Sequence, residues 1–416
     1  MRRSILALCA AALLGSATAA DFIVGADVST LAEVERHGGR FSDAEGRPGD
    51  ALKILQQHGV GWVRLRLWHT PVNAQDVIEE GRVISRLGEP VGGGNNGLAV
   101  TLALARRAKA LGLKLLLDMH YSDFWADPAT QTKPAAWASL QGAELQRALH
   151  AYTAEVLRAF EAAKAGPDML QIGNETNGGF VWPDGKTWQQ TPDEKIGGDA
   201  GFVALLRQGI AAVRAHDART GRRLPVVLHL ADGGDNTLYR RVFDLFAREK
   251  LDFDIIGLSY YPYFHGPLAG LKANLADLST RYQKPLLVVE TAYAHTLANA
   301  DATPNVLNAE RVQAAGYPAT VSGQAALLRD VIDAVAAAPE GRGLGVFYWE
   351  PAWIAVPGAG WRTGEGNGWD NQAMFDATGR ALPSMKAFRG AGVPVSAPAS
   401  VPTSVPTSAP ASSSPR

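Results

Sequence analysis

Eight short, nearly uninterrupted apolar runs recur along this chain of 416 residues and constrain its fold more than any other feature. Uninterrupted apolar runs of this length are typical of parallel strands that are covered on both faces. The runs are Phe22–Val28, Trp62–Trp68, Lys114–His120, Met169–Glu175, Pro225–Ala231, Phe253–Tyr261, Pro285–Thr291 and Gly345–Glu350.

Helical periodicity fills several of the intervals between these runs. Apolar residues recur at three- and four-residue steps in Leu98–Leu111, Gly142–Ala165, Phe202–His216 and Gly323–Ala338. We expect Asn96 to cap the first of these helices. Strands that alternate with helices in this way predict a single-domain α/β fold, the (β/α)8 TIM barrel. The alternative is a doubly wound open sheet, but Val24–Val28 lacks the glycine fingerprint of its dinucleotide-binding form.

The N-terminal segment predicts export. Residues 1–20 have a basic start, the apolar stretch Ile5–Leu14 and small residues before a signal-peptide cut near Ala20. We therefore expect a secreted or periplasmic protein. The cut also removes Cys9, the one cysteine of the chain, so the mature protein is expected to form no disulfide.

The C-terminal segment differs from the rest of the chain in composition. Residues 391–416 are rich in Pro, Ser, Thr and Ala, which predicts a disordered tail and leaves 21–390 as the catalytic domain. The net charge is −1, with both signs well mixed, so nothing indicates binding to nucleic acid. No stretch outside the signal predicts a membrane span, and we expect a monomer.

Polar residues end the predicted strands. In a TIM barrel the carboxyl ends of the strands meet at one mouth, where catalytic residues lie. These strand-end residues are Asp27, Arg64, Arg66, Asp118, His120, Asn174, Glu175, His229, Asp232, Tyr260, Tyr261, Glu290, Trp349 and Glu350. A single one of them could simply cap the barrel, but their convergence predicts a site.

Two glutamates stand out among these residues. Glu175 and Glu290 each end an apolar strand, where a carboxyl group is partly desolvated and can keep a proton near neutral pH. Glycoside hydrolysis needs such a pair, one to protonate the leaving oxygen and one to stabilise an oxocarbenium-like transition state. Arg66 is expected to keep the second carboxylate ionised. Trp349, Trp353, Trp361 and Trp369 are candidate stacking surfaces for sugar rings.

An ordered set of motifs carries a family resemblance. They are GADVSTL (Gly25–Leu31), VRLRLW (Val63–Trp68), GGNNG (Gly93–Gly97), LLLDMHYSDFWADP (Leu115–Pro128), QIGNET (Gln171–Thr176), LSYYPY (Leu258–Tyr263), VVETAY (Val288–Tyr293), FYWEPAW (Phe347–Trp353) and WDNQAMFD (Trp369–Asp376). The chain resembles glycoside hydrolase family 53, the arabinogalactan endo-β-1,4-galactanases, a family of retaining (β/α)8 enzymes.

The resemblance implies specific roles. Glu175 would be the acid/base and Glu290 the nucleophile in hydrolysis of β-1,4-galactosidic bonds in (arabino)galactan. The substrate-binding residues that it implies are Arg66, His120, Asn174, Tyr260, Trp349, Trp125, Trp353, Asn371 and Phe375.

The resemblance also raises the question of calcium, which bacterial members of the family often hold in the loop after the seventh strand. Here that loop is Asn299–Asn308, with Asp301 and Asn305 as candidate ligands. Thr303 and Pro304 intervene, and Ca²⁺ normally takes six or more oxygens. We therefore predict no tight calcium site and no cofactor required for the chemistry.

Three alternatives remain open at this point. A hydrolase of the same barrel type could act on mannan, xylan or β-glucan. A polysaccharide-binding protein without catalysis could use the same aromatic residues. A metal-dependent barrel hydrolase is the third.

Overall fold

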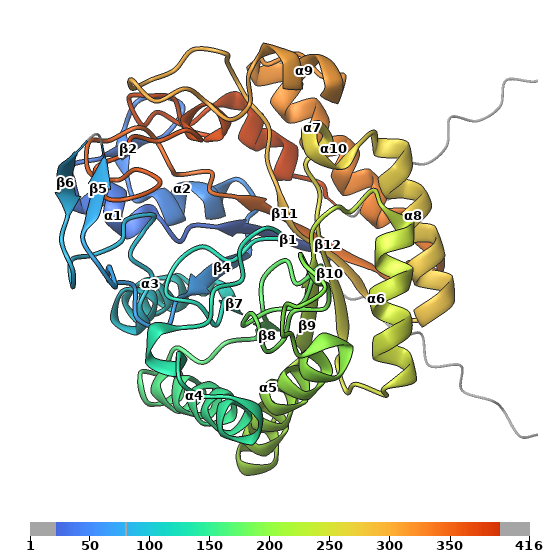
Figure 1. The fold of residues 1–416 in the computed structure, drawn as a ribbon. Helices are drawn as coiled ribbons and strands as arrows, with labels where there is room; N and C mark the ends of the chain where they lie inside the picture. The colour runs from blue at the N-terminus through green and yellow to red at the C-terminus, as the bar shows by residue number, and fades with distance from the viewer. Residues whose placement is uncertain (1–21, 80, 392–416) are drawn as a thin grey trace, which may run out of the picture.

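Eight parallel strands close into a barrel in the computed structural model, which describes residues 22–79 and 81–391 (Figure 1). The order around the barrel is β1-β12-β11-β10-β9-β8-β7-β4. The strands are β1 (Ile23–Asp27), β4 (Trp62–Leu67), β7 (Lys114–Met119), β8 (Met169–Ile172), β9 (Val226–Leu230), β10 (Ile255–Ser259), β11 (Leu286–Thr291) and β12 (Gly343–Trp349). The predicted (β/α)8 barrel is confirmed, and the open doubly wound sheet is wrong. The predicted signal peptide and nearly all of the predicted tail lie outside the described residues.

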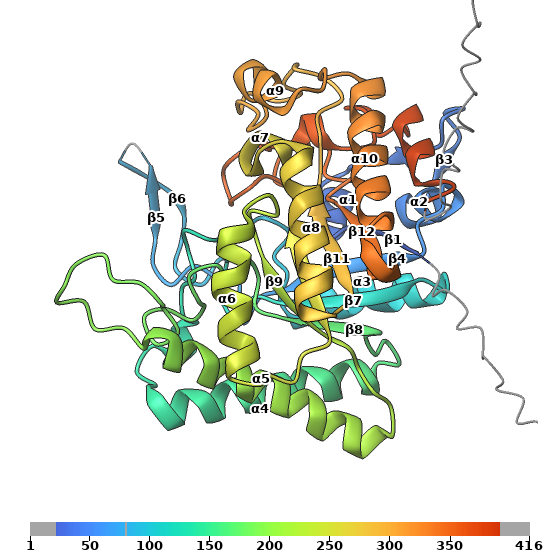
Figure 2. The same ribbon diagram turned by 90° about the vertical axis from the view of Figure 1, so that its right-hand side faces the viewer.

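Helices surround the barrel, as two perpendicular views show (Figures 1 and 2). They are α1 (Leu31–Arg36), α2 (Ala51–Gln57), α3 (Leu98–Ala110), α4 (Gly142–Ala162), α5 (Gly198–Thr220), α6 (Asn236–Arg248), α7 (Pro262–His265), α8 (Leu268–Tyr282), α9 (Ala309–Ala315) and α10 (Val321–Ala336). Short 3-10 helices cover Ala135–Trp137, Pro339–Gly341, Asp370–Gln372 and Pro383–Phe388. Two antiparallel hairpins join β2 (Phe41–Ser42) to β3 (Pro48–Gly49) and β5 (Val77–Glu79) to β6 (Arg82–Ser85). No helix among the described residues is long and apolar enough to cross a membrane.

The four predicted helices all form, as α3, α4, α5 and α10. The predicted cap of α3 is wrong, because Gly97 occupies the N-cap position and Asn96 Nδ2 donates to the carbonyl of Ser29 at 2.7 Å. Asn96 therefore ties the loop after β1 to the loop before α3.

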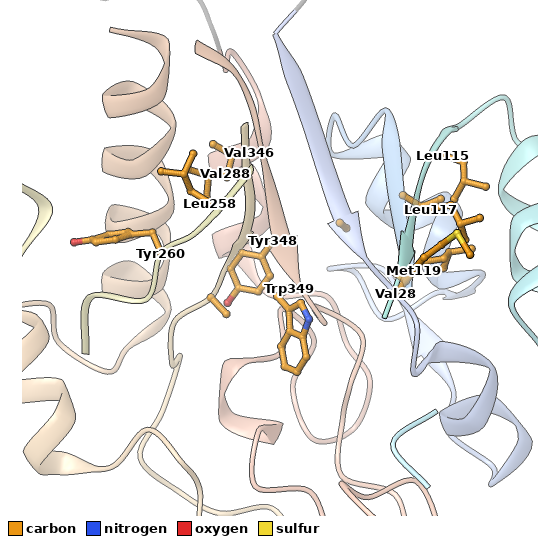
Figure 3. Close-up of a cluster of buried hydrophobic side chains, with 14 of the residues drawn as sticks. Val28, Leu115, Leu117, Met119, Leu258, Tyr260, Val288, Val346, Tyr348 and Trp349 are labelled. Carbon is orange, nitrogen blue, oxygen red and sulfur yellow. The ribbon is translucent and has the colours of Figure 1, made fainter. Parts of the chain in front are cut away.

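Alternation along each strand separates two apolar layers. Successive side chains of a strand point to opposite faces, so Leu115, Leu117 and Met119 of β7 all pack outward against the helices (Figure 3). The residues between them face the barrel axis. The inner apolar cluster contains Ile23, Leu116, Met169, Val227, Ile255, Leu287, Val289 and Phe347.

Towards the carboxyl ends of the strands the inward positions become polar. On β4, Arg64 and Arg66 follow Trp62 at every second residue, and on β7 Asp118 follows Leu116. All these charged side chains are buried. Burying a charge is costly unless it is paired and hydrogen-bonded. The carboxyl-terminal end of the barrel interior must therefore contain a connected polar network, next to the inner apolar cluster.

We predict a cavity effect at Leu117, which is 0% exposed in the layer between β7 and the helices. Leu117→Ala should destabilise the protein by about 2–5 kcal/mol, because the site loses apolar contacts and retains a void. The thermal midpoint measures the loss. Leu87→Ala removes the same atoms from a side chain that is 66% exposed and should leave the midpoint nearly unchanged; equal midpoints for both variants would contradict the layer assignment.

Candidate active site

A cavity of about 350 Å³ opens at the mouth of the barrel, where the strand ends converge. Seven of the residues to which the family resemblance assigns a role line it, namely Arg66, His120, Trp125, Asn174, Glu175, Glu290 and Trp349. Tyr261, Trp361 and Trp369 also line it. The polar strand ends therefore meet in one place, as the barrel predicts.

Glu175 and Glu290 face each other in this cavity. A carboxylate oxygen of Glu175 lies within 4.8 Å of a carboxylate oxygen of Glu290, and a ring nitrogen of His229 lies within the same distance of both. Glu175 follows β8 in a left-handed backbone conformation with φ of +47°. Such a conformation is unfavourable for a residue with a Cβ and persists where the surroundings enforce it.

A bulge turns Glu290 into the barrel. Leu258 of β10 pairs with Val288 of β11, but the next residue, Ser259, pairs with Glu290, so β11 carries one extra residue. Val288 packs outward and Val289 inward. Regular alternation would then send Glu290 outward, and the bulge instead directs it towards the cavity.

Arg64, rather than Arg66, is the cation beside Glu290. Arg64 Nη2 lies 2.8 Å from Glu290 Oε1, and the Tyr261 hydroxyl donates to Glu290 Oε2 at 2.9 Å. The sequence-based expectation for Arg66 is wrong, because its guanidinium pairs with Glu350 at 2.5 Å. Arg66 still lines the cavity, where it lies 4.3 Å from the centroid of the Trp125 ring.

The Arg64 guanidinium also holds the neighbouring strands together. It donates at 2.8 Å to Asp27 Oδ2 from Nη1, and from Nη2 to Asp118 Oδ2 and Asn174 Oδ1. These acceptors come from β1, from β7 and from the residue before Glu175. Because Asn174 Nδ2 donates to the carbonyl of Ala126 at 2.8 Å, its amide orientation is fixed from both ends.

The two glutamates have different electrostatic surroundings. Burial raises the pKa of Glu175 well above its ordinary value, and the negative charge of Glu290 raises it further. Burial also raises the pKa of Glu290, but the positive charge of Arg64 opposes this rise. The proton shared by the pair therefore belongs on Glu175, which leaves Glu290 as the carboxylate. Titratable pairs pushed apart in this way mark an acid and a base or nucleophile.

Two buried histidines support these groups. Burial lowers the pKa of His229 well below its ordinary value, so the ring is neutral; its Nδ1 lies 3.0 Å from Asn174 Oδ1, and its Nε2 lies 2.9 Å from Ser259 Oγ. His120 Nδ1 accepts from Trp68 Nε1 at 3.1 Å. Its Nε2 therefore carries the proton and donates to Asp118 Oδ2 at 3.0 Å.

Tryptophan rings form one wall of the cavity. Trp125 stacks on Trp361 with centroids 4.5 Å apart and planes 19° apart. Trp349 meets Trp369 edge to face at 4.7 Å. Trp353 stacks on Trp361 from behind at 5.5 Å. Broad, rigid aromatic surfaces of this kind match the apolar faces of sugar rings.

Four of the residues assigned to substrate binding do not line the cavity, namely Tyr260, Trp353, Asn371 and Phe375. Tyr260 shares the outward face of β10 with Leu258, its hydroxyl donates to the carbonyl of Gly266, and Figure 3 shows its ring extending away from Trp349. Trp353 is fully buried behind Trp361, with Nε1 donating to the carbonyl of Ala359. Asn371 donates to the carbonyls of Thr296 and Leu307 and so holds the loop after β11.

Phe375, the fourth of these residues, packs on Phe41 in the core, and the centroids of the two rings are 4.8 Å apart. Tyr261 and Arg64 were both among the predicted strand-end residues, but their contacts with Glu290 were not predicted. Counting alternate positions from the buried residues of each strand would have found both, because Tyr261 follows Ser259 and Arg64 follows Trp62 on the inward face.

The calcium candidates already have protein partners. Asp301 Oδ1 accepts from the backbone N–H of Thr303 at 2.7 Å, and Oδ2 accepts from that of Asn367 at 2.7 Å. Asn305 Nδ2 donates to Asp370 Oδ1 at 2.8 Å, so this third carboxylate oxygen also has a protein partner. These carboxylate oxygens thus already accept hydrogen bonds from the protein, whereas Ca²⁺ normally takes six or more oxygens. The residues present therefore do not fit a calcium cage.

Glu175, His229 and Glu290 are the group among the described residues with spacing suited to a metal. The surroundings favour a different use. A metal ligand set of two carboxylates needs both ionised, whereas burial and the charge of Glu290 favour the protonated form of Glu175. Arg64 also occupies the side of Glu290 that a cation would take.

Comparison with known proteins places this site in context. Residues 23–388 match the family model described as glycosyl hydrolase family 53. The endo-beta-1,4-galactanase of Bacillus subtilis (strain 168) is 36% identical, with 89% of this chain and 86% of that protein aligned. The arabinogalactan endo-beta-1,4-galactanase of Cellvibrio japonicus (strain Ueda107) is 35% identical, with 94% and 97% aligned. The solved family 53 catalytic domain of Ignisphaera aggregans superposes with a TM-score of 0.80 at 42% identity, covering 89% of this chain and 96% of that one.

The raised pKa of Glu175 predicts a pH-dependent gain in stability for Glu175→Gln. A carboxyl group whose pKa is higher in the folded state favours folding below its unfolded pKa, about 4.3, and loses this contribution as pH rises through the folded pKa. At neutral pH the buried group therefore opposes folding, and neutral Gln removes that cost. The thermal midpoint of Glu175→Gln should exceed that of the wild type at pH 7, and the difference should shrink towards pH 4.

The matched control for that measurement is Glu155→Gln, which changes an exposed glutamate of α4. It should shift the midpoint little at either pH. A Glu175→Gln midpoint below the wild-type value at pH 7 would show that the carboxylate is stabilised in the folded state, contrary to this assignment.

Proposed function

Because this chain belongs to glycosyl hydrolase family 53, we propose that it is an endo-β-1,4-galactanase that cleaves the galactosidic bonds of (arabino)galactan with retention of configuration. The observation that carries the proposal is the pair Glu175 and Glu290, with carboxylate oxygens within 4.8 Å of each other in a tryptophan-lined cavity. Two relatives that are at least 35% identical to this chain are known as endo-beta-1,4-galactanases, which supports the substrate.

The spacing of the carboxylates supports a double displacement. Retaining glycosidases hold their two carboxyl groups about 5–5.5 Å apart, whereas inverting enzymes need about 6.5–9.5 Å to admit a water molecule. Oxygens within 4.8 Å of each other fit the shorter class. They leave room for a sugar carbon and its leaving oxygen, but not for an intervening water on the far face.

In the first step Glu290 attacks the anomeric carbon while Glu175 gives its proton to the departing oxygen. The Glu290 carboxylate is oriented for this by Arg64 Nη2 and by the Tyr261 hydroxyl. The bond between the anomeric carbon and the leaving oxygen breaks as the ester to Glu290 forms. The second N–H of Asn174 Nδ2 can meet the sugar 2-hydroxyl, because Arg64 and Ala126 hold that amide in place.

In the second step the roles of Glu175 reverse. Now ionised, it takes a proton from a water molecule, which attacks the anomeric carbon and releases Glu290. Two inversions give net retention. The mechanism uses no metal ion, and no cofactor is proposed.

The decisive experiment is hydrolysis of unbranched β-1,4-galactan, with product sizes followed over time. Early release of intermediate lengths supports endo-action, and faster cleavage of mannan, xylan or β-glucan would replace the proposed substrate. Binding without cleavage would favour a silent binding protein. Activity should persist in EDTA; loss of activity in EDTA with recovery on adding a metal would support the metal-dependent alternative.

Variants of the two glutamates test their separate roles. On galactan, Glu175→Gln should lower kcat by about 10²–10⁴-fold because the leaving oxygen loses its acid, and Glu290→Gln should abolish turnover. An aryl β-1,4-galactobioside has a leaving group that departs without protonation, so Glu175→Gln should still release the aryl group in the first step and Glu290→Gln should not. The opposite pattern would exchange the two roles.

Two adjacent tyrosines offer a matched pair for the structure of the site. Tyr261→Phe removes the hydroxyl that donates to Glu290, and should lower kcat on galactan by about ten- to a hundredfold, as about 1.5–3 kcal/mol is typical of hydrogen bonds to charged groups. Tyr260→Phe removes a hydroxyl that donates to the Gly266 carbonyl, outside the cavity. It should leave kcat within about twofold; a larger kcat loss for Tyr260→Phe than for Tyr261→Phe would contradict this placement.

A further inference from the structure

The loop between β8 and α5 carries an exposed indole ring that the mechanism above does not use. Among the described residues, two aromatic side chains are exposed. Trp188 is 44% exposed, and Phe264, which lines the catalytic cavity, is 48% exposed. The loop that leads into α5 projects from the same end of the barrel as the β5–β6 hairpin (Figure 2). The loop that contains Trp188 therefore lies at the mouth end of the barrel, where the strands lead into the helices.

The Trp188 ring is held in place from behind. Lys186 Nζ lies 4.0 Å from its centroid, and the Trp182 ring meets it edge to face at 5.8 Å. Lys186 is itself buried and pairs with Glu194 Oε1 at 2.6 Å. A ring fixed in this way loses little conformational entropy when a ligand stacks on it, which is the property of a preformed binding surface.

The same loop begins at the proposed acid. A Cβ placed on Gly178 would come within 2.8 Å of Trp188 Nε1, so the ring packs on backbone only three residues after Glu175. Asn177, between them, donates from Nδ2 to Asp232 Oδ2 at 2.9 Å, and Asp232 lines the catalytic cavity. Trp188 thus lies on the Glu175 side of the site.

Two depressions follow one another along residues 127–132 and are together called the groove. Asp127 and Pro128 line the catalytic cavity, and the next residues, Ala129–Thr132, line a second depression of about 340 Å³. Trp182 and Lys186, the two residues that hold the Trp188 ring, also line this second depression. Sugar hydroxyls in this depression would meet polar groups of Thr130, Thr132 and Glu194.

We propose that this groove, with Trp188 on its rim, binds the leaving-group part of the galactan chain beyond the sugar whose oxygen Glu175 protonates. The inference rests on the proposed function, because an acid must stand on the side of the departing oxygen. The chain that departs therefore runs along the Glu175 side, where the fixed indole can stack on the apolar face of a galactose ring.

The test compares two substrates that differ only on that side of the bond. Linear β-1,4-galactohexaose extends beyond the scissile bond in both directions, whereas an aryl β-1,4-galactobioside has no sugar on the leaving-group side. Trp188→Ala should lower kcat/KM on the hexaose about tenfold, the loss expected for a stacking contact of about 1.4 kcal/mol, and leave kcat/KM on the aryl substrate unchanged. Trp188→Phe should restore most of the loss.

Gln190→Ala is the matched control, since Gln190 is an exposed residue of the same loop whose backbone N–H, not its side chain, donates to Glu194. It should behave as the wild type on both substrates. Unchanged hexaose kinetics for Trp188→Ala would overturn the groove, and equal losses on both substrates would show that Trp188 acts only through the loop structure. Wild-type protein that cuts xylan or mannan but not galactan or the hexaose would refute the proposed function itself, and this inference with it.

Discussion

One buried guanidinium determines much of this active site. Arg64 lies on β4 and contacts Asp27, Asp118, Asn174 and Glu290, which come from four other positions around the barrel. Removing a single partner from a buried charge network is costly, because the remaining charges lose their compensation. Here the cation holds the strand ends together at the mouth of the barrel. It also stabilises the ionised form of Glu290. Assembly of the fold and charge distribution in the site therefore depend on the same group.

The contrast between the two glutamates follows from this arrangement. Glu290 is buried and Glu175 is half-buried, but only Glu290 has the cation. Glu175 instead has a neutral histidine nearby and the charge of its partner across the cavity. Its positive φ is shared by Tyr121, Asp232 and Glu350, which also follow barrel strands. Backbone strain and uncompensated burial thus concentrate at the mouth, while the inner apolar cluster of the barrel stabilises the fold.

The sequence was sufficient for the barrel, its eight strands and the convergence of polar strand ends, because apolar periodicity reports burial directly. It was less informative on contacts. Choosing Tyr261 over Tyr260 and Arg64 over Arg66 as the partners of Glu290 required knowing which residue of a pair faces inward and how deep it lies. Trp353 and Asn371 lie in loops, where no period fixes direction, and tertiary packing turned both away from the cavity.

The bulge in β11 separates the position of Glu290, the proposed nucleophile, from ordinary strand alternation. Val289 and Glu290 are neighbours in sequence, yet both face the barrel interior, because β11 carries one residue more than β10 at this point. Catalytic competence is thus encoded partly in the length of a strand, and not only in the identity of its residues. Regular pairing of every β11 residue with β10 would instead turn the carboxylate into the helical layer, so a change that removes this bulge but spares every side chain of the site would still silence the enzyme.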